Sequence, residues 1–283
     1  MRIRLIALFS LMLSVPAGAC TLWGAAGMAA GGGTLLAKNR DWRPDHVQSI
    51  RLIHPKRGAS YVGLFADNGI APGLKAGVNE YGLSVVSASA SSLARQYWDS
   101  PDVHGAMLLI LREDHSIDDV VVKATQRFSH SSPMFLLISD HQKLLEVEVG
   151  KDGRYTLQKQ KEGVLAHTNH YLSDELAACN QKIGKSSRVR LERIRTMLAG
   201  GPYSLSDFAA YSQDQQAGPD LSLWRSGKVH TLSSWQIATP VAGPAQLSVR
   251  MANPEQAIVQ KQWLLDDSFW QGPARVLLPE SSE

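Results

Sequence analysis

The chain has 283 residues, of which 44% are hydrophobic and 19% charged, a composition that excludes a disordered tail. Lysine and arginine together number 29 against 26 acidic residues, an excess too small to predict nucleic-acid binding. Two cysteines, Cys20 and Cys179, form at most one bridge; this excludes a disulfide scaffold and argues against a thiolate metal site.

The first residues are typical of a secretory signal peptide. Two arginines precede an uncharged apolar run over residues 5–15, and small residues follow at 17–19. The run is too short to cross a bilayer, which takes about 20 apolar residues. We therefore predict a signal peptide at 1–19, removed by signal peptidase, and a single domain at 20–283 that is exported to the periplasm or secreted.

This cleavage would make Cys20 the first residue of the mature chain. Three interpretations stay open: a cysteine that happens to follow the cut, a lipidated cysteine that serves as an anchor, and an N-terminal nucleophile. Lipoprotein signals favour leucine three residues before the cysteine, where this chain has Ala17. An N-terminal cysteine carries its own base, since its α-amine has an ordinary pKa of about 7.7–8.0 and can accept the thiol proton.

The rest of the chain predicts many strands and few helices. A hairpin is expected from residues 20–26 and 34–37, and it ends in the charged segment 38–42. Residues 76–86 predict two strands around a tight turn, and further strands are expected at residues 49–54, 59–65, 134–139, 143–149, 154–160, 164–166, 221–225, 229–238 and 245–251. Helical spacing occurs in two pieces over 104–127, in the basic segment 186–199 and at 204–211. Mid-chain helices among many strands predict one layered α+β domain.

Two polar segments could carry chemistry. If the hairpin forms, residues 38–41 (Lys-Asn-Arg-Asp) lie near Cys20, where a carboxylate could hold the α-amine and a cation could lower the thiol pKa. The alternative is a solvated strand end. Asn169 offers an amide that could donate to an oxyanion, or it is an ordinary turn residue. His167 and His170 lack further ligands in the sequence, so no metal site is predicted.

Five segments in this order resemble the choloylglycine hydrolase and acyl-CoA:6-aminopenicillanate acyltransferase group of N-terminal nucleophile (Ntn) hydrolases. They are Cys20-Thr, Lys38-Asn-Arg-Asp-Trp, Gly77-Val-Asn-Glu-Tyr-Gly-Leu, Thr168-Asn-His and Ser186-Ser-Arg-Val-Arg-Leu-Glu-Arg. The resemblance covers roughly residues 20 to 250 and implies an αββα sandwich, two antiparallel sheets between helix layers. It also implies cleavage or transfer at a linear amide C–N bond, without a cofactor.

By position, the resemblance makes Cys20 the nucleophile and base, Asp41 the contact of its amine, Asn169 an oxyanion donor and Arg190 a buried cation near the thiol. Lys38 stands where the hydrolase branch has arginine, which keeps the charge without the bidentate fork. Ser89 stands where that branch has asparagine. Ser89 suffices if only its backbone N–H serves the oxyanion hole, and the hole is weaker if a side chain is needed.

The expected function is that of an exported cysteine amidohydrolase acting on a small N-acyl amide. An acyltransferase that uses the same thioester and a lipidated, non-enzymatic lipoprotein are the alternatives. Trp23 and Trp42 are candidates to line an acyl pocket, although aromatic residues near strand ends also form cores. The sequence leaves substrate identity, oligomeric state and the role of Cys179 open.

Overall fold

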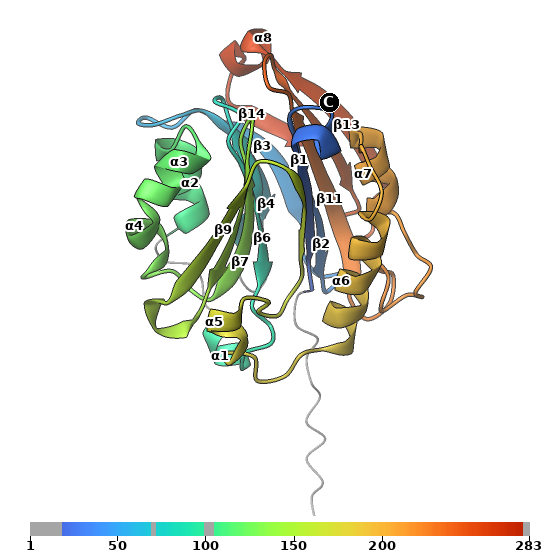
Figure 1. Ribbon diagram of the computed structural model, residues 1–283. Helices are drawn as coiled ribbons and strands as arrows, with labels where there is room; N and C mark the ends of the chain where they lie inside the picture. The colour runs from blue at the N-terminus through green and yellow to red at the C-terminus, as the bar shows by residue number, and fades with distance from the viewer. Residues whose placement is uncertain (1–18, 69–71, 99–104, 280–283) are drawn as a thin grey trace, which may run out of the picture.

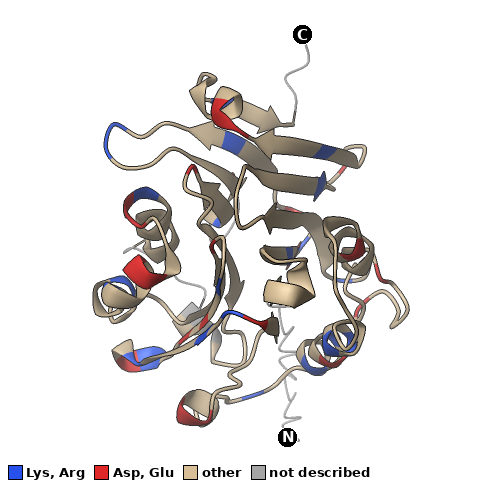
Figure 2. Ribbon diagram, turned by 45° about the horizontal axis from the view of Figure 1, so that its top comes forward, with Lys and Arg blue, Asp and Glu red and all other residues tan. Residues whose placement is uncertain are grey.

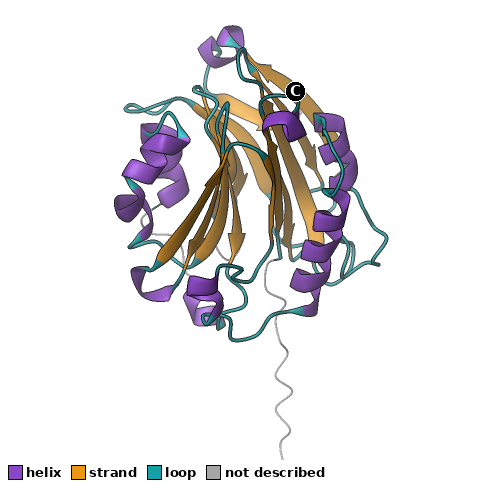
Figure 3. Ribbon diagram, in the orientation of Figure 1, coloured by secondary structure: helices purple, strands orange, loops and turns teal. Residues whose placement is uncertain are grey.

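The computed structural model describes residues 19–68, 72–98 and 105–279. Most of the predicted signal peptide (1–18) therefore lies outside the described residues. The chain forms two antiparallel sheets that face each other, with helices on both outer surfaces (Figures 1 and 3). This arrangement confirms the predicted αββα sandwich. No described helix is long and apolar enough to cross a membrane.

The first sheet has six strands in the order β10-β1-β2-β11-β12-β13. Their bounds are β1 Thr21–Ala26, β2 Thr34–Trp42, β10 Gly163–His167, β11 His230–Thr239, β12 Ala245–Met251 and β13 Val259–Leu265. The helices α6 (Lys185–Met197) and α7 (Leu205–Ser212) cover its outer face (Figure 1). Trp23, Ile194 and Phe208 belong to the apolar layer between this sheet and these helices.

The second sheet has eight strands in the order β14-β3-β4-β5-β6-β7-β8-β9. Their bounds are β3 Gln48–Ile53, β4 Tyr61–Ala66, β5 Gly73–Asn79, β6 Ser84–Ser89, β7 Met134–Ser139, β8 Leu144–Val149, β9 Tyr155–Gln160 and β14 Arg275–Leu278. Its outer face carries α2 (Ala106–Glu113), α3 (Ile117–Val122) and α4 (Ala124–Phe128). The remaining helices are α1 Arg95–Trp98, α5 Asp174–Ala177 and α8 Asp267–Gln271, with 3₁₀ turns at Gly27–Ala30 and Lys151–Gly153.

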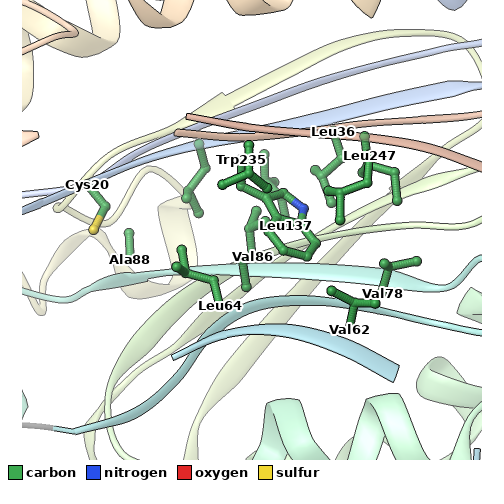
Figure 4. Close-up of a cluster of buried hydrophobic side chains, with 14 of the residues drawn as sticks. Cys20, Leu36, Val62, Leu64, Val78, Val86, Ala88, Leu137, Trp235 and Leu247 are labelled. Atoms are coloured by element: carbon green, nitrogen blue, oxygen red, sulfur yellow. The ribbon is translucent and has the colours of Figure 1, made fainter. Parts of the chain in front are cut away.

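The main core lies between the two sheets, where strand alternation turns one apolar face of each sheet towards the other. Leu36 and Trp235 contribute from the first sheet, and Val62 and Leu137 from the second. Figure 4 shows Cys20 at one end of this cluster, with its sulfur on the side of the second sheet, to which Ala88 belongs. The candidate nucleophile is thus part of the layer between the sheets. The outer helices carry charged residues of both signs (Figure 2).

Several predicted elements differ from the structure. The strand expected to end at residue 37 continues as β2 to Trp42, so the charged segment is inside a sheet. Residues 221–225 form turns and bends instead of a strand, and the Leu223 carbonyl there accepts a hydrogen bond from Asn39. The two helical pieces expected over residues 104–127 form three helices, α2 to α4. Ser116 and Asp119 form a capping box at the start of α3.

The C-terminal elements were not predicted. Strands β13 and β14 and helix α8 follow the last expected strand. The exposed positions of strand β13 are Gln260, Gln262 and Leu264, whereas Lys261 between the two glutamines is partly buried. This mixed pattern, typical of an edge strand, lacks the clean alternation by which a strand is recognised in sequence.

Candidate active site

Strand pairing brings the charged segment next to Cys20. In the β1–β2 ladder Thr21 pairs with Asn39 and Leu22 with Lys38, and the Ala19 N–H donates to the Asp41 carbonyl at 3.3 Å. The predicted hairpin is therefore confirmed. Continuing the register, Cys20 lies across from Arg40, and the peptide bond before Cys20 lies beside Arg40 and Asp41.

Cys20 lines a cavity of about 390 Å³, a volume in the range of small-molecule sites. One side of the cavity is polar and includes Lys38, Arg40 and Asp41. The other side is mainly apolar and includes Tyr61, Phe65, Leu74, Met107, Leu108 and Met134. A nucleophile with cations on one side and apolar side chains on the other suits a substrate that has a polar reacting group and an apolar part.

The three residues expected to contact substrate occupy different places. Trp42 and Ser89 line the cavity. Trp23 is fully buried on the opposite face of β1, where its ring packs against Phe208 at a centroid distance of 6.0 Å. Alternation along β1 explains the difference, since Cys20 and Trp23 are three residues apart and point to opposite faces of the sheet.

Lys38 extends from the first sheet to the backbone of the second. Its buried Nζ donates to the carbonyl oxygens of Lys75, at 2.9 Å, and Ser87, at 2.5 Å. The last pair of the β5–β6 ladder is Ala76 with Val86. Lys75 and Ser87 are the next residues of the two strands, so the ammonium bonds their carbonyls where the strands are no longer paired with each other. Burial lowers the pKa of Lys38 to about 8, and negative charge on Cys20 is the largest opposing influence.

Asp41 is completely buried and has one unsatisfied oxygen. Its Oδ1 accepts a hydrogen bond from Thr231 Oγ1 at 2.7 Å, whereas its Oδ2 has no hydrogen-bond partner among the described residues. The nearest cation to Oδ2 is Arg225, at 4.0 Å. Burial raises the pKa of Asp41 to about 6 against the opposing charges of Arg190 and Arg225.

Arg190 connects Cys20 to Asn169. From the buried face of α6, its Nη1 donates to the Cys20 carbonyl and to Thr21 Oγ1, both at 2.6 Å. Its Nη2 donates to Asn169 Oδ1 at 2.9 Å. Burial lowers the pKa of Arg190 to about 10, so it stays charged at neutral pH. Arg190 is hydrogen-bonded to the backbone of Cys20, whereas the negative charge of the Cys20 thiolate acts on Arg190 only by electrostatic attraction over a distance.

The Asn169 amide is held at both ends. Arg190 fixes its oxygen, and its Nδ2 donates to the Ser89 carbonyl at 2.9 Å. Asn169 is buried, and it reaches the cavity region through Ser89, which lines the cavity. These contacts fix which end of the Asn169 amide is the nitrogen. The hydrogen bond to Ser89 uses one of the two Nδ2 hydrogens, so the second can donate to another acceptor.

Sequence reasoning missed other residues of the site. Arg40 lines the cavity and is buried, with its guanidinium bonded to Gln48 and His46. Thr231 and Arg225 contact Asp41 from a segment about 190 residues later in the chain. The signal for Arg40 was its place in the charged segment 38–41, which the sequence predicts near Cys20, whereas the pairing of β2 with β11 that brings Thr231 here has no local signal.

A second polar cluster lies at the C-terminal end of β10, whose last residue is His167. Ligand atoms of Glu146, Glu148 and His167 lie within 4.8 Å of one another, so the expectation that His167 has no neighbouring ligands is wrong. Glu148 already accepts hydrogen bonds from His167 Nε2 and from Leu172 and Ser173. The cluster therefore anchors the segment after β10, which carries Asn169, and its donor set is of a kind that could also hold a metal ion.

Both cysteines are free and buried. The thiol of Cys179 accepts a hydrogen bond from Arg154 Nη2 at 3.5 Å. The bridge between Cys20 and Cys179 that the sequence left open is therefore absent from this structure.

Comparisons with known proteins agree with this fold. Two crystal structures of conjugated bile acid hydrolase from Clostridium perfringens match the fold. A cysteine-to-alanine mutant is 15% identical with a TM-score of 0.51, and an arginine-to-leucine variant is 14% identical with a TM-score of 0.52. Each match covers 90% of this chain and 96% of the other. A search of curated proteins found no match.

The family model of acyl-coenzyme A:6-aminopenicillanic acid acyl-transferase matches residues 28–255. This range includes Lys38, Asp41, Asn169 and Arg190 and begins after Cys20. The match confirms, at the level of the family, the expected class of enzymes, Ntn-type amide hydrolases and related acyltransferases. The chain belongs to the acyl-coenzyme A:6-aminopenicillanic acid acyl-transferase family.

Proposed function

We propose that this protein is an exported amidohydrolase that cleaves a linear N-acyl amide through a thioester on Cys20. Cleavage after Ala19 would expose the Cys20 amine. The observation that carries the proposal is the buried Oδ2 of Asp41, which has no hydrogen-bond partner among the described residues, because the Asp41 carbonyl is bonded to Ala19 across the strand pair. An ammonium group formed at Cys20 would supply this oxygen with a hydrogen-bonded cation, which Arg225, 4.0 Å away, does not.

In the proposed reaction, the Cys20 amine takes the thiol proton and the sulfur attacks the substrate carbonyl carbon. A C–S bond forms and the carbonyl π electrons move onto oxygen. The Asn169 Nδ2 hydrogen that Ser89 does not use, together with a backbone N–H near Ser89, would donate to this oxyanion. Lys38 would stabilise the thiolate by its charge, since both groups line one cavity.

The tetrahedral intermediate then breaks down. The C–N bond breaks as the Cys20 ammonium gives its proton to the departing nitrogen, which leaves an acyl thioester and a free amine. Water loses a proton to the Cys20 amine and attacks the thioester. Breaking the C–S bond releases a carboxylic acid, and the sulfur recovers its proton.

Acyl transfer is the second candidate. An acceptor amine in place of water would resolve the same thioester into a new amide. The match to an acyltransferase family favours this outcome as a competing reaction.

The test is to express the full chain for export and to determine the mass of the product. The expected mass begins at Cys20, without lipid, in a soluble fraction. Incubation with a panel of N-acyl amides should add one acyl mass to the protein. Cys20→Ala should form no adduct, whereas Cys179→Ser, which alters the other buried thiol, should still form one.

Two outcomes contradict the proposal. A start before Cys20 would leave an amide in place of the base. A diacylglycerol mass on Cys20 in the membrane fraction would instead support the lipoprotein alternative.

A further inference from the structure

Glu146 is a buried carboxylate that lacks a bonded partner. The residue is 9% exposed, and among the described residues it forms no hydrogen bond and no ion pair within 4 Å. Burial raises the pKa of this carboxyl group. Buried acidic groups in proteins are ordinarily paired or bound to a metal ion, so the surroundings of Glu146 show what could bind it.

Two further groups converge on Glu146 from different sheets. Glu146 and Glu148 are two residues apart on β8, so strand alternation places both on the same face of the second sheet. Leu144, on that face, belongs to the core between the sheets. His167 comes from the first sheet, at the end of β10. One ligand atom each of Glu146, Glu148 and His167 lies within 4.8 Å of the other two.

Neighbouring hydrogen bonds orient two of the three groups. The Nδ1–H of His167 donates to the Thr168 carbonyl at 3.1 Å, which directs Nε2 into the cluster in the manner usual for metal-binding histidines. Nε2 lies 2.9 Å from Glu148 Oε1. Two ligand atoms of a tetrahedral ion with bonds of about 2.0–2.1 Å are about 3.3 Å apart. His167 and Glu148 are therefore close to the spacing that such an ion requires.

A cavity gives access to the third group. Glu146 lines a cavity of about 530 Å³ that shares no lining residue with the cavity of Cys20. Glu175 and Arg195 also line it and are exposed, so the cavity opens to solvent. An ion could enter by this path, and the cavity has room for a water molecule as a further ligand.

We propose that Glu146, Glu148 and His167 bind one divalent cation of the zinc type, with a water molecule from this cavity as the fourth ligand. Two carboxylates and a neutral imidazole together carry two negative charges, which a divalent ion cancels. The ion would join β8 of the second sheet to β10 of the first, directly before the segment that carries Asn169. This is a structural site, and it does not depend on the chemistry proposed for Cys20.

The test is calorimetric titration of zinc into the untagged, chelator-treated full chain with Cys20→Ala and Cys179→Ser, which removes both thiols as competing ligands. One zinc ion should bind with a Kd of about 10 µM or lower. Glu146→Gln removes a ligand charge and breaks no hydrogen bond among the described residues, and it should weaken binding at least tenfold. Glu175→Gln, the same change at an exposed residue of the same cavity, is the matched control and should leave the Kd unchanged.

Hydrogen exchange locates the ion without any change at Glu146. The Leu172 and Ser173 amides donate to Glu148, so zinc should slow their exchange in the same thiol-free chain. Circular dichroism verifies that Glu146→Gln is folded. Binding that is weaker than expected or does not saturate at one ion, an equal Kd in folded Glu146→Gln, or amide exchange that zinc leaves unchanged would overturn the inference.

Discussion

The Lys38 ammonium donates a hydrogen bond to the Ser87 carbonyl, so a side chain of β2 ends on the backbone of β6 in the opposite sheet. The same Nζ bonds the Lys75 carbonyl of β5. A charged group near the nucleophile is thus also a link between the two sheets, and its titration should affect activity.

We expect Lys38 to set the alkaline limit of activity. Its pKa is lowered to about 8, so raising the pH through this value removes the positive charge that stabilises the Cys20 thiolate. The pH profile of kcat/KM should fall above about pH 8. In Lys38→Arg the charge persists, and the alkaline limb should move up by at least one pH unit, whatever the loss in rate. If the alkaline limb of the Lys38→Arg profile lay at the same pH as in the wild type, Lys38 would not be the group that causes it.

Asp41 should make the stability of the uncleaved chain depend on pH. Its carboxyl keeps its proton up to about pH 6 in the folded chain, against 3.8 ordinarily. Between these values the unfolded chain has released the proton and the folded chain has not, so raising the pH lowers the free energy of unfolding. The loss is up to about 3 kcal/mol by pH 7.

Cleavage after Ala19 should reduce this loss, because the new Cys20 ammonium lowers the Asp41 pKa. Urea denaturation of the uncleaved and the cleaved chain at pH 4 and pH 7 measures the effect. Asp41→Asn in both forms is the control and should make their pH dependences equal. If the free energy of unfolding depended equally on pH in the two forms that keep Asp41, the result would contradict a contact between the Cys20 amine and Asp41.

Asn169→Ala should lower kcat by roughly 10²–10³, the usual effect of losing one oxyanion donor. KM should change little, because the developing charge exists only in the transition state. The measurement is steady-state kinetics, with substrate binding to the Cys20→Ala background as control. An equal loss in ground-state binding would assign Asn169 to substrate binding.

Glu148 should hold the segment that carries Asn169. It accepts hydrogen bonds from the backbone of Leu172 and Ser173 and from His167. Glu148→Ala should destabilise the fold by roughly 3–5 kcal/mol, since it leaves His167 and two N–H groups without a partner. Hydrogen exchange of the Leu172 and Ser173 amides should quicken before global unfolding. Glu175→Ala, an exposed residue on α5, should leave both amides protected.

The sequence predicted the parts of this molecule that depend on local pattern. The hairpin that carries Cys20 and the charged segment follows from alternation and turn residues, and the order of five motifs indicated the family. The contacts of Asp41 with Thr231 and Arg225 depend on pairing between strands far apart in the chain, which no local pattern encodes. Trp23 shows the same limit, since its strand was predicted but the face that meets α7 was not.

Cys20 directly precedes a strand that is paired on both sides, by β10 and by β2. Chain termini are usually frayed, and an amine at a free end samples many positions. Here the conformational entropy of the residue after the nucleophile is already lost when the sheet forms. If the chain begins at Cys20, its base and its sulfur are therefore preorganised by the same backbone, and substrate binding need not order them.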